Sequence, residues 1–411
     1  MINKIGLIGL STMGANLALN FAYSGVEVVV FNRSADKTKK LENQKNIITT
    51  YTIEDFLNEL GDKKVILLLV KAGEPTDETI KHILPSITDE DIVIDLGNAN
   101  YVDSLRRSLL IKNYYVCGIS GGEKGARYGA SLMLSGNIKY STELEELFRI
   151  VSANDFKDNP TIGYLGEGVV GNIVKTVHNG IEYVQMQVLA EIYSILRFYA
   201  GYDVVKISEI FKSWSESKQD YLTDIMSQAL SDPNLIDTVM PKVDSKGTGK
   251  WTGQMALKED VFSTFISYSY NLRMLNNEVL ALQQNNDINI EKLSDLYDQA
   301  YLKALEEGLS IISKMSPGVD LKEVRRIWQG GCIIRNHLLL TEKKSDNPRF
   351  IKLFSPLRTC DLPLPVLSMM YQGALLDVIG TVGNPLLAIA RDVFGSHGFY
   401  SKNGDLIYKE W

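Results

Sequence analysis

Short, nearly continuous runs of apolar residues recur over roughly the first 160 residues, and stretches with helical spacing separate them. The runs lie at 4–10, 26–31, 64–70, 91–96 and 114–119. Their length and lack of polar alternation are typical of strands in a parallel sheet that is covered on both faces. The stretches between them, such as 14–24 and 76–83, have the spacing of crossover helices. This part of the chain is therefore predicted to be a Rossmann-like, doubly wound α/β domain.

The pattern changes after the glycine-rich segment 163–172. Strand signals almost disappear, and long amphipathic stretches with helical spacing follow at 170–200, 205–229, 252–282, 290–314 and 320–340. A chain of 411 residues is also too long for a single core, which suggests two or three domains. We expect three parts: a Rossmann-like domain over 1–168, a large all-helical domain over 169–398, and a short polar tail over 399–411 without a predicted element.

One predicted helix has an unusual polar face. Its apolar residues recur at helical spacing and would face a core: Ile173, Val177, Ile181 and Val184. A second set shares the other face: Lys175, His178, Asn179 and Glu182. Solvated helix faces are usually built from Lys, Glu, Gln and Arg, whereas this face offers an amine, an imidazole, an amide and a carboxyl. It is either an ordinary solvated face or a set of proton donors and acceptors that points into a cleft.

Composition and charge exclude several classes of protein. A net charge of −7 and a pI near 5.4 argue against a general nucleic-acid binder, so any bound anion must be held by a local cluster of cations. The apolar runs are shorter than a membrane span, and the opening MINKIGLIGL leaves no room for a signal peptide. Three cysteines without paired spacing argue against a disulfide framework or a zinc site. These features predict a cytoplasmic protein.

A glycine-containing turn between the first strand and its helix is a candidate dinucleotide site. It reads G-L-S-T-M-G from Gly9 to Gly14, and Ser11 replaces the middle glycine of the usual G-x-G-x-x-G pattern. Gly9 permits the tight turn and Gly14 permits close packing of helix on strand, so that free N–H groups can face a pyrophosphate. The alternative is a plain glycine turn.

The end of the second predicted strand bears on the choice of cofactor. An NAD enzyme usually places Asp or Glu there, to bind the ribose hydroxyls. This chain has Asn32, Arg33 and Ser34, and the first acid is Asp36. A guanidinium binds a 2′-phosphate that a carboxylate would repel, so Arg33 favours NADP over NAD. The alternative is that Arg33 is an ordinary surface residue.

Motifs along nearly the whole chain resemble those of the 6-phosphogluconate dehydrogenase family, the decarboxylating, NADP-linked enzymes of the pentose phosphate pathway. The three most specific are ISGGEKGARYG, KTVHNGIEY and KGTGKWT; the others are GLIGLSTMGANLALN, FNRS, LLLVKAG, DLGNAN, WQGGCIIR, DLPLP and RDVFGSH. The resemblance implies oxidative decarboxylation of 6-phosphogluconate to ribulose 5-phosphate, with NADP as the cofactor and a phosphorylated sugar acid as the substrate.

The resemblance also implies roles for the residues around the reacting carbons. Lys175 matches the general base and Glu182 the general acid of the family. The residues that match groups positioning the substrate or the nicotinamide are Asn98, Ser120, Gly121, Gly122, His178 and Asn179. A lysine with its usual pKa is a poor base at neutral pH, so burial or neighbouring cations must lower the pKa of Lys175.

The remaining implied residues bind the phosphate and the cofactor. The phosphate set is Tyr183, Lys246, Thr248, Arg273 and Arg391, with His397 as the C-terminal histidine of the site. In the family the last Arg and His reach into the neighbouring subunit, which implies a homodimer. The cofactor set is Gly9, Leu10, Ser11, Thr12, Met13, Gly14, Asn32, Arg33, Ser34, Val70, Lys71, Ala72 and Asn98. Because no Asp/His cluster has ligand spacing, no metal is predicted.

Several features depart from the resemblance or are interpreted as structural. The chain is some tens of residues shorter than a usual member, with gaps near 342–356 and at its end. Ser11, Ala99 and Gln329 replace residues more usual in the family, and Cys332 is interpreted as a small buried apolar residue. Two other functions stay open: a related dehydrogenase for a different β-hydroxy acid, and a non-catalytic NADP-binding protein.

Overall fold

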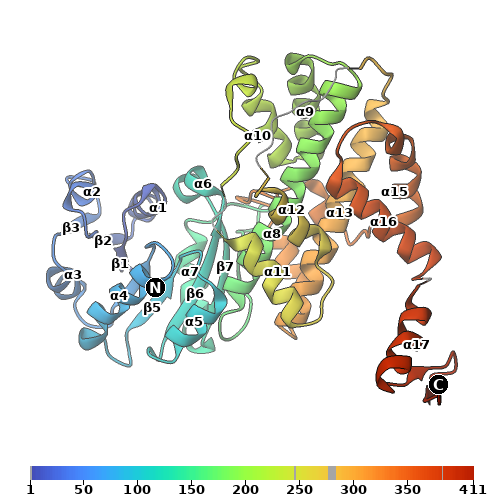
Figure 1. The fold of residues 1–411 in the computed structure, drawn as a ribbon. Coiled ribbons are helices and arrows are strands. Elements are labelled where there is room, and N and C mark those ends of the chain that lie inside the picture. The colour runs from blue at the N-terminus through green and yellow to red at the C-terminus, as the bar shows by residue number, and fades with distance from the viewer. Residues whose placement is uncertain (1, 245–246, 276–283, 382) are drawn as a thin grey trace.

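The computed structural model describes residues 2–244, 247–275, 284–381 and 383–411 of the chain. An α/β part leads into a large helical part, and the C-terminal segment extends away from both (Figure 1). This arrangement confirms the predicted fold class. The last strand of the large sheet ends at Tyr164 and the first long helix begins at Val170. The division into three domains stays a prediction.

The α/β part is built on one sheet in the order β3-β2-β1-β4-β5-β6-β7-β8. The strands are β1 (Lys4–Ile8), β2 (Glu27–Phe31), β3 (Ile47–Thr50), β4 (Val65–Leu68), β5 (Ile92–Asp95), β6 (Tyr114–Ser120), β7 (Ser131–Gly136) and β8 (Ile162–Tyr164). The five predicted strands are present, whereas β3, β7 and β8 were not predicted. In the central strands, successive residues alternate between two cores, one on each face of the sheet. This double burial explains why the strand sequences are almost continuously apolar.

The sheet is parallel from β3 to β6 but not throughout. Strands β1 and β4 pair in parallel, with Gly6 opposite Ile66, whereas β6 and β7 are antiparallel, with Ser120 opposite Ser131. The five predicted strands are thus parallel, as expected, and the antiparallel pairing involves the unpredicted strand β7. A parallel connection needs a crossover of a dozen or more residues, and the segment from Gly121 to Ala130 is too short for one.

Helices pack on the two faces of this sheet. They are α1 (Thr12–Tyr23), α2 (Ala35–Lys39), α3 (Ile53–Leu60), α4 (Glu74–Ile83), α5 (Tyr101–Ser108), α6 (Gly122–Tyr128) and α7 (Ser141–Arg149). The predicted crossover helices correspond to α1 and α4. Helix α1 follows β1 directly, so its N-terminus lies at the carboxyl end of the parallel strands, where ligands bind in open α/β sheets.

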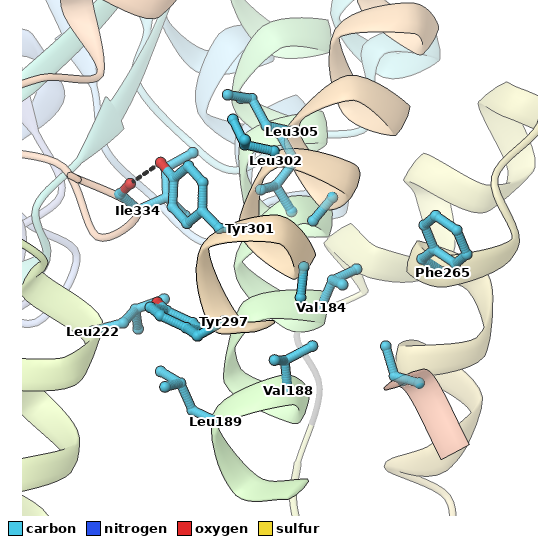
Figure 2. Packing of buried hydrophobic residues seen from close by; sticks show 14 of the residues in the cluster. Val184, Val188, Leu189, Leu222, Phe265, Tyr297, Tyr301, Leu302, Leu305 and Ile334 are labelled. Carbon is cyan, nitrogen blue, oxygen red and sulfur yellow. Dashed lines mark hydrogen bonds between the residues drawn. The ribbon is translucent and has the colours of Figure 1, made fainter. Parts of the chain in front are cut away.

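The helical part surrounds two long helices, α8 (Val170–Ser194) and α13 (Ile290–Met315). The other helices of this part are α9 (Val204–Lys218), α10 (Tyr221–Ala229), α11 (Thr248–Lys258), α12 (Thr264–Leu272), α14 (Leu321–Ile327), α15 (Asn347–Phe354) and α16 (Pro365–Ile379). Figure 2 shows Val184 and Val188 of α8 in one buried cluster with Tyr297 and Tyr301 of α13. Tyr301 donates a hydrogen bond of 2.7 Å to the carbonyl of Ile334, so its hydroxyl is satisfied inside the core.

Some predicted helical stretches are broken in the structure. The stretch 205–229 forms two helices, because Gln219 adopts a left-handed conformation (φ 50°) between α9 and α10. The stretch 252–282 contains α11 and α12, and its residues 276–282 lie outside the described part of the chain. In the stretch 320–340, the α-helix ends at Ile327.

The C-terminal segment forms an arm. Helix α17 (Asn384–Gly395) and a hairpin of β9 (Phe399–Tyr400) and β10 (Leu406–Ile407) lie beyond the end of α16, apart from the rest of the chain (Figure 1). The expectation that the tail has no regular element is therefore wrong. Asp392 fixes the hairpin because its carboxylate accepts hydrogen bonds from the Gly398 and Lys409 amides and from the Trp411 indole.

Among the described residues, no helix by itself has the length and apolar composition to cross a membrane; α16 and α17 meet those criteria only as a pair, across a bend of 84°.

Candidate active site

Helix α8 lies unusually close to the strands of the sheet. A Cβ atom at Gly171 would come within 2.2 Å of the Met133 carbonyl oxygen on β7. A Cβ atom at Gly118 on β6 would come within 2.5 Å of the Cβ atom of Lys175. These glycines let the helix approach the backbone of the sheet, and the approach buries Lys175 beneath β6. The polar face of α8 is therefore turned toward the junction of the two parts, and not toward bulk solvent.

Burial changes the protonation of this face. Lys175 is 7% exposed, and desolvation lowers the pKa of its amine, although the negative charge of Glu182 acts in the opposite direction. His178 is fully buried, and burial together with the nearby Lys175 holds the pKa of its imidazole well below the usual value. The histidine is therefore neutral at physiological pH, and the lysine amine is easier to deprotonate than a solvated one.

His178 is the centre of a hydrogen-bonded cluster. Its Nε2 lies 3.0 Å from Ser120 Oγ and 2.9 Å from Cys332 Sγ, and its Nδ1 lies 3.0 Å from Asn179 Oδ1. A neutral imidazole has one N–H, so these contacts are satisfied together when Nδ1–H donates to Asn179 and Nε2 accepts from a hydroxyl or thiol. Glu182 Oε2 lies 4.0 Å from the same Nδ1. The structure thus brings five chemically distinct groups to one end of the sheet.

Two members of this surrounding shell were not predicted. Burial raises the pKa of the Cys332 thiol to about 12, so the group is a neutral S–H that contacts His178. The interpretation of Cys332 as a small apolar residue is incomplete, because its sulfur is part of the polar cluster. The indole of Trp328 meets the imidazole edge-on, with ring centroids 5.6 Å apart. Both residues belong to WQGGCIIR, one of the motifs that carry the family resemblance.

A cavity of about 560 Å³ opens next to this cluster. Its walls include the turn at Gly121 and Gly122 from the α/β part and Tyr221 and Ile333 from the helical part. Gly121 has φ 113° and Gly122 has φ 61°, values that favour glycine. The amide of Ile333 donates to Ser120 Oγ at 3.4 Å, which links the cavity wall to the His178 cluster. The predicted residues Ser120, Gly121 and Gly122 therefore lie together at the junction.

Further along α8, three elements meet around Tyr183. The guanidinium carbon of Arg273, at the end of α12, lies 3.4 Å from the centre of the Tyr183 ring. A Cβ atom at Gly249, in α11, would come within 2.7 Å of the same ring. Thr248 begins α11 and is 3% exposed. The structure thus groups Tyr183, Thr248 and Arg273, and Arg273 is a half-buried stacked residue, not an ordinary surface one. Lys246 lies outside the described residues.

The glycine turn has the shape that a dinucleotide site requires. Gly9 has φ 105°, and a Cβ atom there would come within 2.5 Å of the Leu69 carbonyl oxygen. A Cβ atom at Gly14 would come within 2.0 Å of the Gly9 carbonyl oxygen. Ser11, which replaces the middle glycine, is the N-cap of α1, and its hydroxyl accepts a hydrogen bond from the Gly14 amide at 3.4 Å. The turn and the first amides of α1 therefore form a cradle that fits a pyrophosphate, and the Ser11 hydroxyl supports it.

The other residues of the predicted cofactor set surround the turn. Asn32 Oδ1 accepts a hydrogen bond of 2.9 Å from the Leu10 amide, so the end of β2 is fixed to the turn. Arg33 follows with an exposed side chain. The segment after β4 lies against Gly9, because a Cβ atom there would also meet Val70 Cγ1 at 2.9 Å. Thr12 and Met13 begin α1, Ser34 is the N-cap residue of α2 after β2, and Lys71 and Ala72 lie in the loop after β4.

A buried ion pair supports the loop that carries Asn98. Asp95, at the end of β5, accepts hydrogen bonds from the Gly97 amide (2.9 Å) and from Arg107 Nη1 (3.3 Å). Arg107 is fully buried and also donates to the Gly73 carbonyl at 3.0 Å. One guanidinium therefore joins the loops after β4 and β5, which both carry predicted cofactor residues. Asn98 itself is exposed at the tip of its loop.

Two predicted residues are not brought to this junction within one chain. Arg391 and His397 are exposed on the C-terminal arm, which Figure 1 shows apart from α8 and α11. Elsewhere in the described residues, no three His, Cys, Asp or Glu side chains are grouped as metal ligands would be.

Comparisons with known proteins agree with this geometry. A model described as the NAD binding domain of 6-phosphogluconate dehydrogenase matches residues 4–171, and a model of the C-terminal domain of 6-phosphogluconate dehydrogenase matches residues 171–354. A decarboxylating 6-phosphogluconate dehydrogenase from Buchnera aphidicola is 34% identical, and the match covers 96% of each chain. The enzyme of that name from Staphylococcus aureus is 32% identical over an alignment of 470 positions, which covers 100% of this chain and 99% of the relative.

Solved structures give the same result. The 6-phosphogluconate dehydrogenase of Plasmodium falciparum, studied in its apo form and with its cofactor NADP+ and its substrate 6-phosphogluconate, matches with a TM-score of 0.88 and 31% identity. This match covers 99% of the present chain and 100% of the other. A 3-hydroxyisobutyrate dehydrogenase of Mycobacterium tuberculosis matches at TM-score 0.50 and 14% identity, over 77% of this chain and 100% of that one, and shares the fold alone. Since the S. aureus alignment is longer than the 411 residues here, this chain lacks segments that the relative has.

Proposed function

The chain belongs to the 6-phosphogluconate dehydrogenase family, and we propose that it catalyses the NADP-dependent oxidative decarboxylation of 6-phosphogluconate to ribulose 5-phosphate and carbon dioxide. The observation that carries the proposal is the buried amine of Lys175, whose pKa is lowered, on the same helix face as Glu182. A base and an acid on one face can act on the same small molecule.

In this proposal the neutral amine of Lys175 is the general base. It takes the proton of the hydroxyl on carbon three of the substrate, while the hydride on that carbon leaves. NADP, when bound, supplies the hydride acceptor. The protonated Lys175 then donates to the new carbonyl oxygen, which stabilises the negative charge that develops there as the carbon–carboxylate bond breaks. Because a β-keto acid loses carbon dioxide readily once this oxygen is stabilised, the reaction needs no metal.

Glu182 completes the proposed reaction as the general acid. After carbon dioxide leaves, carbon one of the enediol must gain a proton, and a carboxyl about two turns along α8 from Lys175 lies on the correct face to give it. As carbon one is protonated, the enediol hydroxyl returns its proton to the neutral Lys175 amine and becomes the carbonyl of the product. Loss of this proton from Lys175 to solvent and uptake of one by the Glu182 carboxylate restore both the base and the acid. His178, held neutral, serves as a hydrogen-bonding partner for the substrate together with Asn179 and Ser120.

We assign the phosphate of the substrate to the cluster around Tyr183. A dianionic phosphate in a protein of net charge −7 needs local cations, and Arg273 stacks on the ring of Tyr183, against which Gly249, the residue after Thr248, also packs. Asn98 and the glycine turn lie on the cofactor side, and the exposed Arg33 is placed to bind the 2′-phosphate that distinguishes NADP.

The protein is proposed to be a cytoplasmic homodimer. The C-terminal arm extends away from its own chain and exposes large apolar side chains, including Leu386, Leu387 and Phe394. A second copy would cover them. The partner's arm would then supply Arg391 and His397 to the site, where this chain by itself has neither.

A steady-state assay tests the proposed function directly. Purified protein, NADP and 6-phosphogluconate should produce reduced cofactor together with an equal amount of carbon dioxide. Parallel reactions with NAD, and with an unphosphorylated sugar acid, measure the preference for each phosphate. Turnover that ignores the phosphate of the substrate would favour a related dehydrogenase, and cofactor binding without turnover would favour a non-catalytic role.

A further inference from the structure

Helix α12 begins without a cap from its own sequence. Within the described chain, the hydroxyl of its N-cap residue Ser263 contacts the hydroxyl of Ser267 and not a helix amide. Two first-turn amides are instead satisfied from another helix: Glu307 of α13 accepts from Phe265 N at 3.1 Å through Oε2 and from Ile266 N at 2.8 Å through Oε1. Each carboxylate oxygen is thus used by one amide of α12.

This cross-helix cap is buried deeply. Glu307 is 5% exposed, and burial raises the pKa of its carboxyl to about 8, against the two amide hydrogen bonds that lower it. An acid in such a place costs stability, which apolar side chains of similar size would avoid. Because the local Ser263 could in principle cap the helix, a carboxyl from α13 does more than satisfy two amides. It fixes the start of α12 to one position on α13.

The position of α12 matters because of what its other end carries. Arg273 directly follows the helix, and its guanidinium lies 3.4 Å from the ring centre of Tyr183 on α8. The nine residues of α12 are one short rigid rod between Glu307 and Arg273. A shift or rotation at the start of the rod therefore reaches the guanidinium at its end.

Helix α13 is in turn fixed to the catalytic helix next to Glu307. A Cβ atom at Gly308 would come within 2.5 Å of Ile181 Cδ1 and 3.1 Å of Val177 Cγ1, so α13 and α8 are in close contact at this point. Figure 2 shows Phe265 of α12 in the same cluster as Val184 of α8 and Leu305 of α13. Glu307 thus joins α12 to the rigid pair that carries Lys175 and Glu182.

We propose that Glu307 is a positioning residue for the substrate's phosphate group: by capping α12 from α13, it holds Arg273 stacked on Tyr183 at the distance from Lys175 that a phosphorylated sugar acid requires. The inference rests on the proposed function, because it assigns the phosphate to Arg273. The proposed role of Glu307 concerns binding of the substrate's phosphate only, and not binding of the cofactor or the reaction at the carbons.

The test is Glu307→Gln, with Glu306→Gln as the matched control. A glutamine has one acceptor oxygen, and its NH₂ group would face the second helix amide, so one of the two hydrogen bonds is replaced by a donor–donor contact. Glu306 is the neighbouring residue on α13 and also accepts a backbone amide, that of Ser345, which is remote in sequence from α12. For Glu307→Gln we expect the KM for 6-phosphogluconate to rise about tenfold with kcat changed less than threefold, and for Glu306→Gln both to stay within twofold.

Competitive inhibitors separate positioning from general damage. Inorganic phosphate should inhibit the Glu307→Gln variant about tenfold more weakly than the wild type, whereas unphosphorylated gluconate should inhibit both equally. Glu307→Asp keeps a carboxyl with two oxygens and should recover part of the loss, and it replaces the glutamine variant if that one does not fold. Equal weakening of both inhibitors, or of neither, overturns the inference. Failure of the wild type to oxidise 6-phosphogluconate overturns the proposed function itself and the inference with it.

Discussion

In the α/β part, the proposed cofactor site is a turn of six consecutive residues that the side chains of Ser11 and Asn32 support, whereas in the helical part the proposed substrate site is made of side chains from distant segments. Two side chains accept hydrogen bonds from amides of the Gly9–Gly14 turn: Ser11 within it, and Asn32, which is 22 positions from Leu10. His178 contacts Ser120 at a separation of 58 positions and Cys332 at a separation of 154. A site made from a local turn depends on backbone shape, and a site made from packed helices depends on burial. The two should therefore fail in different ways when residues are changed.

The first and largest effect is expected on the side-chain site. Lys175→Met removes the proposed base and keeps an unbranched chain of similar length, so turnover should fall about 10³-fold, within the range that general bases contribute. The dissociation constant for NADP should stay within twofold, as measured by fluorescence titration. Thermal stability should be unchanged or higher, because the buried amine is costly. A variant that loses NADP affinity but keeps kcat would show that the polar face of α8 serves the cofactor.

The converse experiment changes the main-chain site. At Gly14→Ala the new methyl group would lie 2.0 Å from the Gly9 carbonyl oxygen, which forces the turn away from α1. We expect NADP affinity to fall by about 10–100-fold, while kcat at saturating cofactor falls less than fivefold. Gly373→Ala is the matched control, since its methyl group would meet Phe265 at an ordinary 3.5 Å. If the two alanine variants bind NADP equally well, the glycine turn is not the cofactor cradle.

The pH dependence should also separate the two sites. Burial lowers the pKa of Lys175, so the fraction of neutral amine grows as the pH rises toward that pKa, and kcat/KM should rise with it by up to tenfold per pH unit on this limb. Between pH 7 and 9 the affinity for NADP should stay constant, because main-chain amides do not titrate there. Initial rates and cofactor titrations over this range measure both quantities. A rate that falls steadily from pH 7 would assign the essential titration to a group other than Lys175.

The same contrast explains how much of the fold was predictable. The continuous apolar runs predicted the strands that are buried on both faces, which are β1, β2, β4, β5 and β6. The other three strands were missed for different reasons. Strand β3 (IITT) is only partly buried, and β8 (IGY) has three residues. Strand β7 is fully buried but contains Ser131 and Ser135, whose hydroxyls donate to the carbonyls of Ile327 and Gly168. The buried serines, satisfied by tertiary hydrogen bonds, interrupt the apolar run by which the strand could have been predicted.

The candidate site was predictable to a similar, uneven degree. Helical spacing alone placed Lys175, His178, Asn179 and Glu182 on one face, because periodicity is a local property. It could not show that this face is buried, since the burial depends on Gly118 in β6, which admits the lysine. The contact of His178 with Cys332 and the cap that Glu307 provides join residues remote in sequence, and no spacing rule connects them. Resemblance to a family supplied roles for some of these residues, but it did not supply their contacts.

The smallest expected effect tests an exposed side chain of the α/β part that is proposed to contact the cofactor directly. Arg33 is exposed after β2, so its loss should leave the fold and the glycine turn intact. Arg33→Ala should lower kcat/KM with NADP about tenfold and leave kcat/KM with NAD within twofold, because only NADP carries the 2′-phosphate. Lys37→Ala, on the exposed surface of α2 one turn further along, removes the same charge and should change neither value by more than twofold. If both variants shift the preference for NADP over NAD equally, general surface charge decides the choice of cofactor. If neither variant shifts it, the 2′-phosphate is bound by main chain as well, and the α/β part then binds the cofactor without this side chain.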